Sequence, residues 1–304
     1  MTYEQFKQSL IANLKKLFPD GTQISIRPFS QNNHIILDGL IILEIDSNVS
    51  PTIYLNHYYE KYLNGTSFST LQNQILHYYY DHRNIRSIDT SFFTCFEKVH
   101  SRIVYKLIHY EKNRELLKEV PHFPYLDLAI VFYYLAQEGP CQSTSIPIFN
   151  QHLTFWNISK DTLLFLARKN TPALMASCCS SFSDLFLSAL DLFPASDHQS
   201  PLEPPDSDLV PMYVLTNQQR VNGACCMLYQ NVLHQISEQL NDNLYVLPSS
   251  IHEVILIPAS TTENPQELSR IVQEINRTEV APEEVLSDCV YHYNRCSDQI
   301  LMYQ

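Results

Sequence analysis

Hydrophobic and polar positions follow their clearest pattern near the C-terminus, between residues 213 and 294. From residue 221 to residue 240, apolar side chains recur every three or four positions, and this spacing predicts one long amphipathic helix. The run VILI at residues 254–257 is typical of a strand that is covered on both faces. Together with a short strand at residues 244–247, the pattern predicts the order strand, helix, hairpin, helix and strand.

The first ninety residues predict a similar order of elements. Thr2 followed by Gln5 is the pattern of a capping box, which opens a helix. An alternating segment and a longer apolar segment then predict a hairpin over residues 24–45. Ser50 and Pro51 are residue types favoured where helices begin, so a second helix is expected to start there. The chain is therefore expected to carry helix–hairpin–helix units near both ends.

Two strands rich in β-branched and aromatic residues are predicted in the middle of the chain, at residues 102–109 and 125–135. Lys106 is the only charge inside the apolar run of the first strand, and Asp127 is the only charge in the second. Because an isolated buried carboxylate is costly, we expect these two side chains to form an ion pair between paired strands. A structural role for this pair is favoured over a catalytic one.

These elements predict an α+β fold in which helices pack on a mixed or antiparallel sheet. The chain is expected to divide into an N-terminal portion (residues 1–90), a central strand-rich and then helical portion (91–193), and a C-terminal portion (212–304). Residues 194–211 combine five prolines with Ser and Asp, a composition typical of an extended linker.

Composition and charge argue against nucleic acid and membrane as partners, and they favour the cytoplasm as the compartment. The 304 residues are 45% hydrophobic and carry a formal net charge of −12, so the chain can bury a large core but lacks the basic clusters that bind nucleic acids. It has no apolar run of about eighteen residues and no signal-peptide pattern. Its eight cysteines are scattered, which indicates free thiols. We therefore expect an acidic cytoplasmic protein that binds neither nucleic acid nor membrane.

Four segments carry a resemblance to a known family. The runs IVYKLIHYEKNRELLKEVPH, LDLAIVFYYL, IHEVILIPAS and INRTEVAPEEVLSDCVYHYNR resemble those of an uncharacterised family from anaerobic gut Gram-positive bacteria, classed as a domain of unknown function. The resemblance spans nearly the whole chain. It implies kinship and a bacterial origin, and it brings no known activity, substrate or catalytic residue.

One group of polar residues is a candidate ligand-binding site. Thr216, Asn217, Arg220, Asn222 and Gly223 lie where a strand is expected to end and a helix to begin. Free backbone N–H groups at such a point can hold an anion, and a glycine allows close approach. Helix capping by one of the two asparagines explains the same residues. Capping is favoured, because no Gly-rich phosphate-binding pattern surrounds them.

Metal binding is not expected, although Cys289, His292 and Cys296 have the residue types of metal ligands. On a strand, Cys289 and His292 would point to opposite faces, and no second pair of ligands stands nearby in the sequence. The sequence also lacks a nucleophile elbow, a phosphate loop and a zinc-protease pattern. We therefore assign no metal, no cofactor and no catalytic residue.

Two classes of function remain open. The favoured hypothesis is a non-catalytic cytoplasmic protein whose partner is another protein or a small molecule. The alternative is an enzyme of unrecognised type, such as a hydrolase whose site is assembled from distant segments. An interaction protein should expose a large apolar or tyrosine-rich patch, whereas an enzyme should have a cleft where Asp127, a histidine or a cysteine converges with polar partners.

Overall fold

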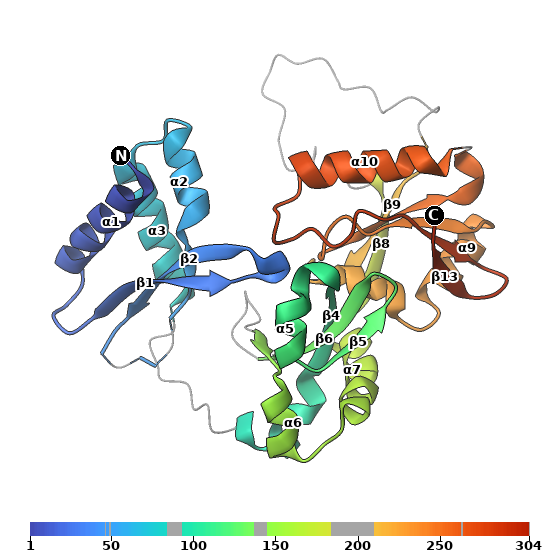
Figure 1. The fold of residues 1–304 in the computed structure, drawn as a ribbon, viewed down its shortest axis with the longest axis horizontal. Coiled ribbons are helices and arrows are strands. Elements are labelled where there is room, and N and C mark those ends of the chain that lie inside the picture. Colours follow the sequence, from blue (N-terminus) through green and yellow to red (C-terminus); the bar gives the residue numbers. More distant parts are fainter. Residues whose placement is uncertain are drawn as a thin grey trace. The chain divides into compact units, whose positions relative to one another are not determined.

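The computed structural model describes residues 1–83 (except 46 and 49), 93–136, 145–183 and 210–303 (except 263). The chain forms two compact units, residues 1–92 and 93–304, which Figure 1 shows as a ribbon. Both units combine helices with antiparallel sheets, so the α+β fold is confirmed. Within the described ranges, no helix has both the length and the apolar character needed to cross a membrane. Most of residues 194–211 lies outside these ranges, so the linker stays a prediction.

The first unit is built on a three-stranded antiparallel sheet. Its elements, in chain order, are α1 (Tyr3–Leu17), β1 (Gln23–Ser30), the 3-10 turn η1 (Asn32–His34), β2 (Ile36–Leu43), β3 (Ile53–Tyr54), α2 (Leu55–Leu63) and α3 (Phe68–His82), and β2 is the central strand. Thr2 Oγ1 accepts a hydrogen bond from the Gln5 N–H (3.3 Å), and Gln5 Oε1 accepts one from the Thr2 N–H (2.9 Å). The capping box at the start of α1 is therefore confirmed.

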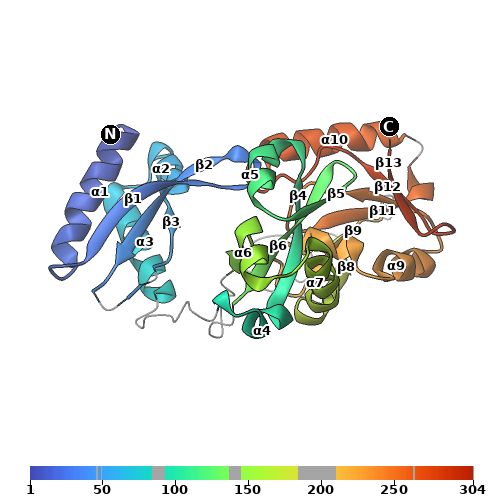
Figure 2. The same ribbon diagram turned by 60° about the horizontal axis from the view of Figure 1, so that its bottom comes forward.

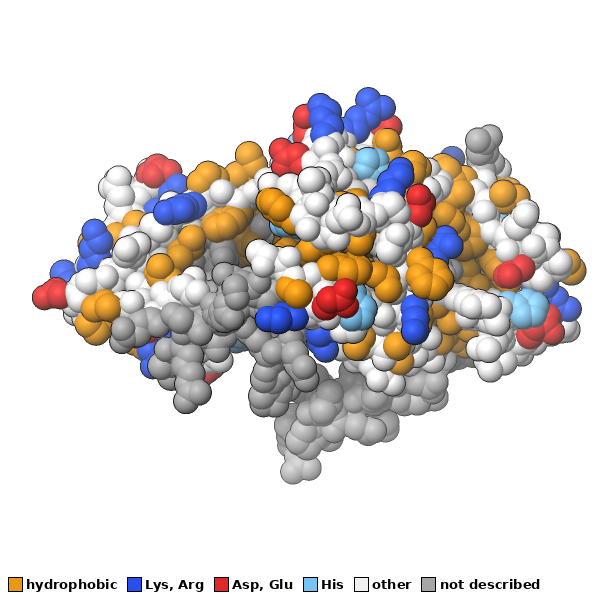
Figure 3. Space-filling model, turned by 90° about the horizontal axis from the view of Figure 1, so that it is seen from below, with side chains coloured by type: hydrophobic (Ala, Val, Ile, Leu, Met, Phe, Trp, Pro, Cys, Tyr) orange, Lys and Arg blue, Asp and Glu red, His pale blue; other side chains and the backbone are white. Residues whose placement is uncertain are grey.

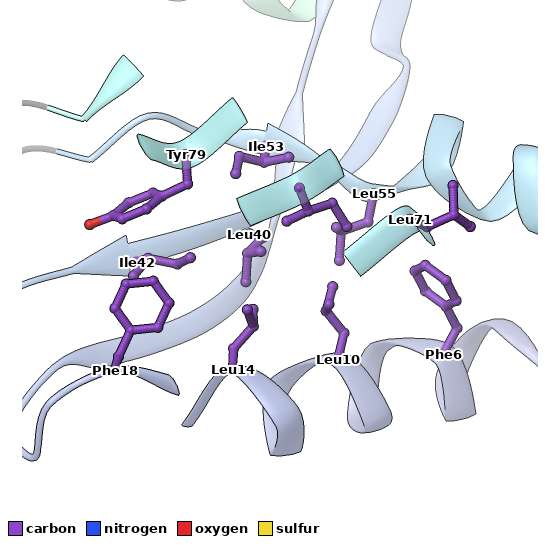
Figure 4. Packing of buried hydrophobic residues seen from close by; sticks show 11 residues of the cluster. Phe6, Leu10, Leu14, Phe18, Leu40, Ile42, Ile53, Leu55, Leu71 and Tyr79 are labelled. Carbon is purple, nitrogen blue, oxygen red and sulfur yellow. The ribbon is translucent and has the colours of Figure 1, made fainter. Parts of the chain in front are cut away.

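One buried cluster joins the elements of the first unit. In Figure 4, Phe6, Leu10 and Leu14 point from α1 into this cluster, and Leu14 faces Leu40 of β2. The helices α2 and α3 bury further residues in the same cluster, namely Leu55, Leu71, Ile75 and Tyr79. Each turn of α1 thus contributes one fully buried side chain, as its spacing of apolar residues requires.

The predicted start of the second helix is wrong. Ser50 and Pro51 precede a short strand, β3, in which Ile53 pairs with Leu40 of β2, and α2 begins only at Leu55. Ile53 is 2% exposed, so pairing with the sheet buries a β-branched side chain that suits an extended backbone. Ser50 Oγ accepts a hydrogen bond from the Ile42 N–H (3.1 Å) and so serves the sheet rather than a helix.

The second unit contains two antiparallel sheets. The smaller one has the order β4 (Ile103–His109), β6 (Leu128–Leu135) and β5 (His122–Tyr125), and β7 (Ser145–Pro147) also pairs with β6. Around it lie α4 (Phe96–Val99), η3 (His100–Arg102), η4 (Glu111–Asn113), α5 (Arg114–Glu119), α6 (Asn150–Trp156) and α7 (Lys160–Leu174). The strand expected over residues 125–135 is confirmed from Leu128 onward as β6, whereas Tyr125 ends β5, because the chain reverses at Leu126, which has a positive φ of 54°.

The larger sheet has six strands in the order β13, β12, β10, β11, β9 and β8. These strands are β8 (Ser177–Ser181), β9 (Tyr213–Asn217), β10 (Leu244–Leu247), β11 (Val254–Pro258), β12 (Tyr291–Asn294) and β13 (Gln299–Met302), and η6 (Ala259–Thr261) follows β11. The predicted apolar strand is confirmed as β11, with neighbours on both sides. On one face, α10 (Pro265–Thr278) packs Leu268 and Val272 against Tyr245 and Ile257.

The long helix expected over residues 221–240 is broken in two. A 3-10 helix, η5 (Gly223–Leu228), is followed by an extended residue, Tyr229, and then by α9 (Val232–Leu240). The break occurs because the Tyr229 hydroxyl donates to the backbone oxygen of Met175 (3.0 Å) and because Asn231 adopts a left-handed conformation with φ 63°. The order α9, β10–β11 hairpin, α10 still confirms a helix–hairpin–helix unit near the C-terminus.

Candidate functional site

A pocket of about 520 Å³ opens in the second unit where both of its sheets contribute residues. Figure 2 shows α7 and α9, the two helices that form part of its wall. The lining residues are Tyr105, Tyr125, Ile130, Leu164, Arg168, Met227, Leu228, Tyr229, Gln230, Asn231, Leu233, His234, Tyr293, Asp298 and Ile300. Segments nearly two hundred residues apart in the sequence therefore meet at one cavity.

Four tyrosines give the pocket its aromatic walls. The rings of Tyr105 and Tyr229 meet edge to face, with their centroids 6.3 Å apart. Two of the hydroxyls are used by the protein itself: Tyr229 donates to Met175, and Tyr293 donates to Asp298 Oδ1 (2.7 Å). These two tyrosines are thereby fixed in place, and Asp298 already has a hydrogen-bond donor.

The other two tyrosine hydroxyls have no protein partner in the described ranges. Tyr105 lies on β4 and is 2% exposed, and Tyr125 ends β5. Burial raises the pKa of Tyr125 to about 12. Burial also raises the pKa of Tyr105, the thiols of Cys225 and Cys226 raise it further, and Arg168 opposes that rise. Both hydroxyls are therefore protonated at neutral pH and can donate hydrogen bonds.

The start of α9 adds polar groups to the same pocket. Asn231 is the N-cap residue, but its side chain makes no capping hydrogen bond. No acceptor in the described part of the chain pairs with the backbone N–H of Leu233 or His234. The ring atom Nδ1 of His234 is also buried without a partner. An uncapped helix end leaves N–H donors that normally require an acceptor.

Arg168 is the one cation in the lining of this pocket. It lies on α7, its side chain is exposed, and no carboxylate of the described residues forms an ion pair with it. Asp298 is the only acidic residue in the lining, and it is held by Tyr293. The guanidinium is thus free to bind a group that enters from solvent.

Comparison with known families identifies the chain. A family model described as a family of unknown function, DUF5688, matches residues 3–295. The chain belongs to the DUF5688 family. No curated protein and no solved structure matches it. The resemblance noted in the sequence is therefore confirmed as far as an uncharacterised family, and its bacterial origin stays a prediction.

In this DUF5688 protein, the residues proposed from the sequence lie at the end of β9 (Thr216 and Asn217), in the loop that follows (Arg220 and Asn222) and at the start of η5 (Gly223). Asn217 Oδ1 accepts hydrogen bonds from the N–H groups of Gln219 (3.0 Å) and Val221 (3.3 Å). Thr216 Oγ1 donates to the backbone oxygen of His252 (2.7 Å), and His252 Nδ1 accepts from the Asn222 N–H (3.2 Å). Most of these polar groups therefore hold the loop together.

Gly223 is the first residue of η5, and it lies where a side chain would not fit. A Cβ atom there would lie 2.2 Å from Thr216 Oγ1 and 2.5 Å from the His252 backbone oxygen. Arg220 is exposed. None of the five residues, from Thr216 to Gly223, lines the 520 Å³ pocket, and ligand binding by them stays a prediction.

The expected ion pair between Lys106 and Asp127 is wrong. Asp127 lies in the turn between β5 and β6, where its carboxylate accepts hydrogen bonds from Ser287 Oγ (2.6 Å) and from the Tyr291 hydroxyl. Lys106 lies opposite Val131 in the middle of the sheet, and no described residue forms an ion pair with it. Burial lowers the pKa of its amine.

The Asp127 cluster is a closed structural contact. Ser287 and Tyr291 are both fully buried, and the Cys289 N–H donates to Ser287 Oγ (2.9 Å). Burial raises the pKa of the Cys289 thiol, and the nearby Asp127 charge adds to this effect. A protonated thiol beside buried hydroxyls is not an activated nucleophile.

The structure does not gather Cys289, His292 and Cys296 into one group. The His292 ring packs on Tyr245, with the centroids 5.4 Å apart, whereas Cys296 is exposed in the turn after β12. Among the described residues, no three or more His, Cys, Asp or Glu side chains lie together so that they could hold a metal ion.

Sequence reasoning missed the pocket because its residues are scattered. Tyr105, Tyr125, Arg168 and His234 each resemble an ordinary core or surface residue in the sequence. The break before α9 also left no local signal, because Leu228 and Val232 keep the spacing of four residues that a continuous helix would have.

Proposed function

We propose that this DUF5688 protein is a non-catalytic binding protein for a small molecule that occupies the 520 Å³ pocket. Several unpaired polar groups around one cavity carry the proposal: the Tyr105 and Tyr125 hydroxyls, the first N–H groups of α9, His234 Nδ1 and the Arg168 guanidinium. One of these groups, His234 Nδ1, is a fully buried atom without a partner, and such an atom costs free energy. A ligand that supplies the missing partners would recover part of that cost.

The size and composition of the pocket support a small ligand. Its volume of about 520 Å³ falls in the range of about 300–1,000 Å³ that is usual for sites that bind small molecules. Aromatic and aliphatic residues are the more numerous in its lining, but polar atoms make up the larger part of the lining surface. Such a wall suits a small ligand that carries polar groups as well as an apolar part.

A binding role is favoured over catalysis by the state of the ionisable groups. The lining contains no cysteine or serine that could act as a nucleophile. Its carboxylate, Asp298, is held by Tyr293, and the Asp127 cluster is buried. The pocket therefore offers groups that hold a ligand rather than a nucleophile and base in contact.

We place the protein in the bacterial cytoplasm as part of the same proposal. The seven cysteines that lie in the described ranges are all free, as expected for a reducing compartment. The acidic net charge of −12 supports a partner other than nucleic acid.

A screen for ligand-induced stabilisation tests this function. A ligand present at 100 times its dissociation constant should raise the free energy of unfolding by about 2.7 kcal/mol, measured as an increase in Tm. Leu164→Trp should abolish the increase, because Leu164 lines the pocket from α7 and a larger side chain there fills the cavity.

Phe165→Trp is the matched control. Phe165 is the next residue on α7 and is 71% exposed, so this variant should keep the full ligand-induced increase in Tm. If Leu164→Trp and Phe165→Trp respond to the ligand equally, the ligand does not occupy this pocket and the proposal fails.

A further inference from the structure

The lining of the pocket is electrostatically uneven. Arg168 and the start of α9 both present positive character, since a helix N-terminus carries about half a unit of positive charge on its free N–H groups. α9 has nine residues and no side-chain cap. An anion is the ligand group that completes such a helix end.

A second observation at the same place points to a ligand. Tyr105 is 2% exposed and lines the pocket, and its hydroxyl has no acceptor in the described ranges. Buried tyrosine hydroxyls usually have a hydrogen-bond partner. Arg168 lies close enough to Tyr105 to affect its pKa, so the cation and the free hydroxyl belong to one region of the wall.

We infer that the ligand is an aromatic or similarly flat molecule with one anionic group, either a carboxylate or a phosphate. The anionic group binds Arg168 and the free N–H groups at the start of α9, and it accepts a hydrogen bond from Tyr105. The flat body lies against Tyr125, the lining tyrosine that keeps a partly exposed side chain. This inference rests on the proposed function and specifies the class of ligand.

The pocket lining supports a localised anion site rather than a broad basic field, because it contains one Lys or Arg residue, Arg168. Figure 3 views the second unit from the side of α6 and α7, where hydrophobic side chains lie between isolated charged ones. A guanidinium is more weakly hydrated than an ammonium group and can bind a carboxylate or phosphate through two hydrogen bonds.

Calorimetric titration of the full chain with four probes tests the inference. The anionic probes are 4-hydroxyphenylacetate and phenyl phosphate, and the neutral probes are 4-hydroxyphenylacetamide and phenol. We expect at least one anion to bind about tenfold or more tightly than its neutral counterpart, because only the anion forms charge-assisted hydrogen bonds. The two anions distinguish a carboxylate ligand from a phosphate ligand.

Three variants locate the anion. Arg168→Gln should weaken the anionic probe about tenfold or more, whereas Lys169→Gln, which removes an exposed cation outside the pocket lining, should leave its affinity within about twofold. Tyr105→Phe removes a hydroxyl that no described residue needs, so it should weaken binding without lowering Tm.

Three outcomes separate this inference from the proposed function. Tighter anion binding that depends on Arg168 supports both. Equal binding of anionic and neutral probes, or equal effects of Arg168→Gln and Lys169→Gln, overturns the anionic class and leaves a binding pocket in place. If none of the four probes binds, this ligand class is overturned, and the Leu164→Trp screen decides the proposed function.

Discussion

At the scale of single residues, Glu44 shows how one carboxylate links separate elements of the first unit. Its Oε1 atom accepts hydrogen bonds from the Tyr79 hydroxyl (2.8 Å) and from Arg83 Nη1 (2.6 Å). The hydrogen bond from Tyr79, together with Arg83, lowers the pKa of Glu44 although partial burial opposes the change. The contact ties the end of α3 to the segment that follows β2.

Tyr79→Phe should lower the free energy of unfolding at pH 7 by roughly 1 kcal/mol, a value reduced by solvent screening because Glu44 is partly exposed. The folded-state pKa of Glu44 lies below its unfolded value of about 4.3, so the stabilisation is present above that pH and is lost as the pH falls through the folded-state pKa. Urea unfolding at pH 7 and at about pH 3 checks this sign.

Tyr78→Phe is the control for this prediction. Tyr78 precedes Tyr79 on α3, and its ring stacks on His82, so the variant should unfold like the wild type at both pH values. A difference between wild type and Tyr79→Phe that is unchanged in acid would show that Glu44 is not the group involved.

At the scale of elements, Asp127 joins the β5–β6 hairpin to β12 across the two sheets of the second unit. Its carboxylate is the acceptor for two buried hydroxyls, those of Ser287 and Tyr291, which come from a segment about 160 residues later. The Asp127 backbone oxygen also accepts from the Tyr110 N–H (2.9 Å). Asp127 therefore holds three parts of the second unit together: its own turn, the end of β4 and the strand β12.

Asp127→Asn should destabilise the protein by about 2–4 kcal/mol, because two fully buried hydroxyls lose a charged acceptor and one of them meets an amide donor. The measurement is the free energy of unfolding in urea. Asp288→Asn, at a partly exposed carboxylate nearby, should cost less than about 1 kcal/mol, since an amide oxygen can still accept from Asn276. Equal losses for the two variants would contradict this account.

The same residues explain how far the sequence could predict the structure. Asp127 is isolated among apolar residues in the sequence, and this isolation correctly predicted that its carboxylate needs a partner. The sequence did not show which residue that partner is. The turn at Leu126 moves Asp127 away from Lys106, and the true partners come from a distant segment whose approach no local pattern indicates. Strands and capping boxes were predictable because their signals are local. The pocket was not, since it exists only after both sheets have assembled.

At the scale of the whole molecule, the two units have separate hydrophobic clusters. The buried cluster of the first unit contains residues between Phe6 and Tyr79. In the second unit, one of the clusters among the described residues joins α10 to β10 and β11. The division near residue 92 follows this separation. Further subdivision at residues 194–211 stays a prediction.

Leu10→Ala should therefore weaken the first unit selectively. Leu10 is fully buried, and removing such a side chain costs about 2–5 kcal/mol. Hydrogen exchange should show faster exchange in α1, α3 and β2, while the amides of β10 and β11 keep their protection. An equal loss of protection in both units would contradict separate cores.

The walls of the pocket come from strands of both sheets of the second unit and from α7 and α9. A molecule bound there would touch all of them at once and act as a non-covalent cross-link. Local opening of any one wall would then require the bound molecule to leave first, so proteases would cut the occupied protein more slowly than the empty one. The supply of ligand could in this way determine how long each copy of the protein persists in the cell.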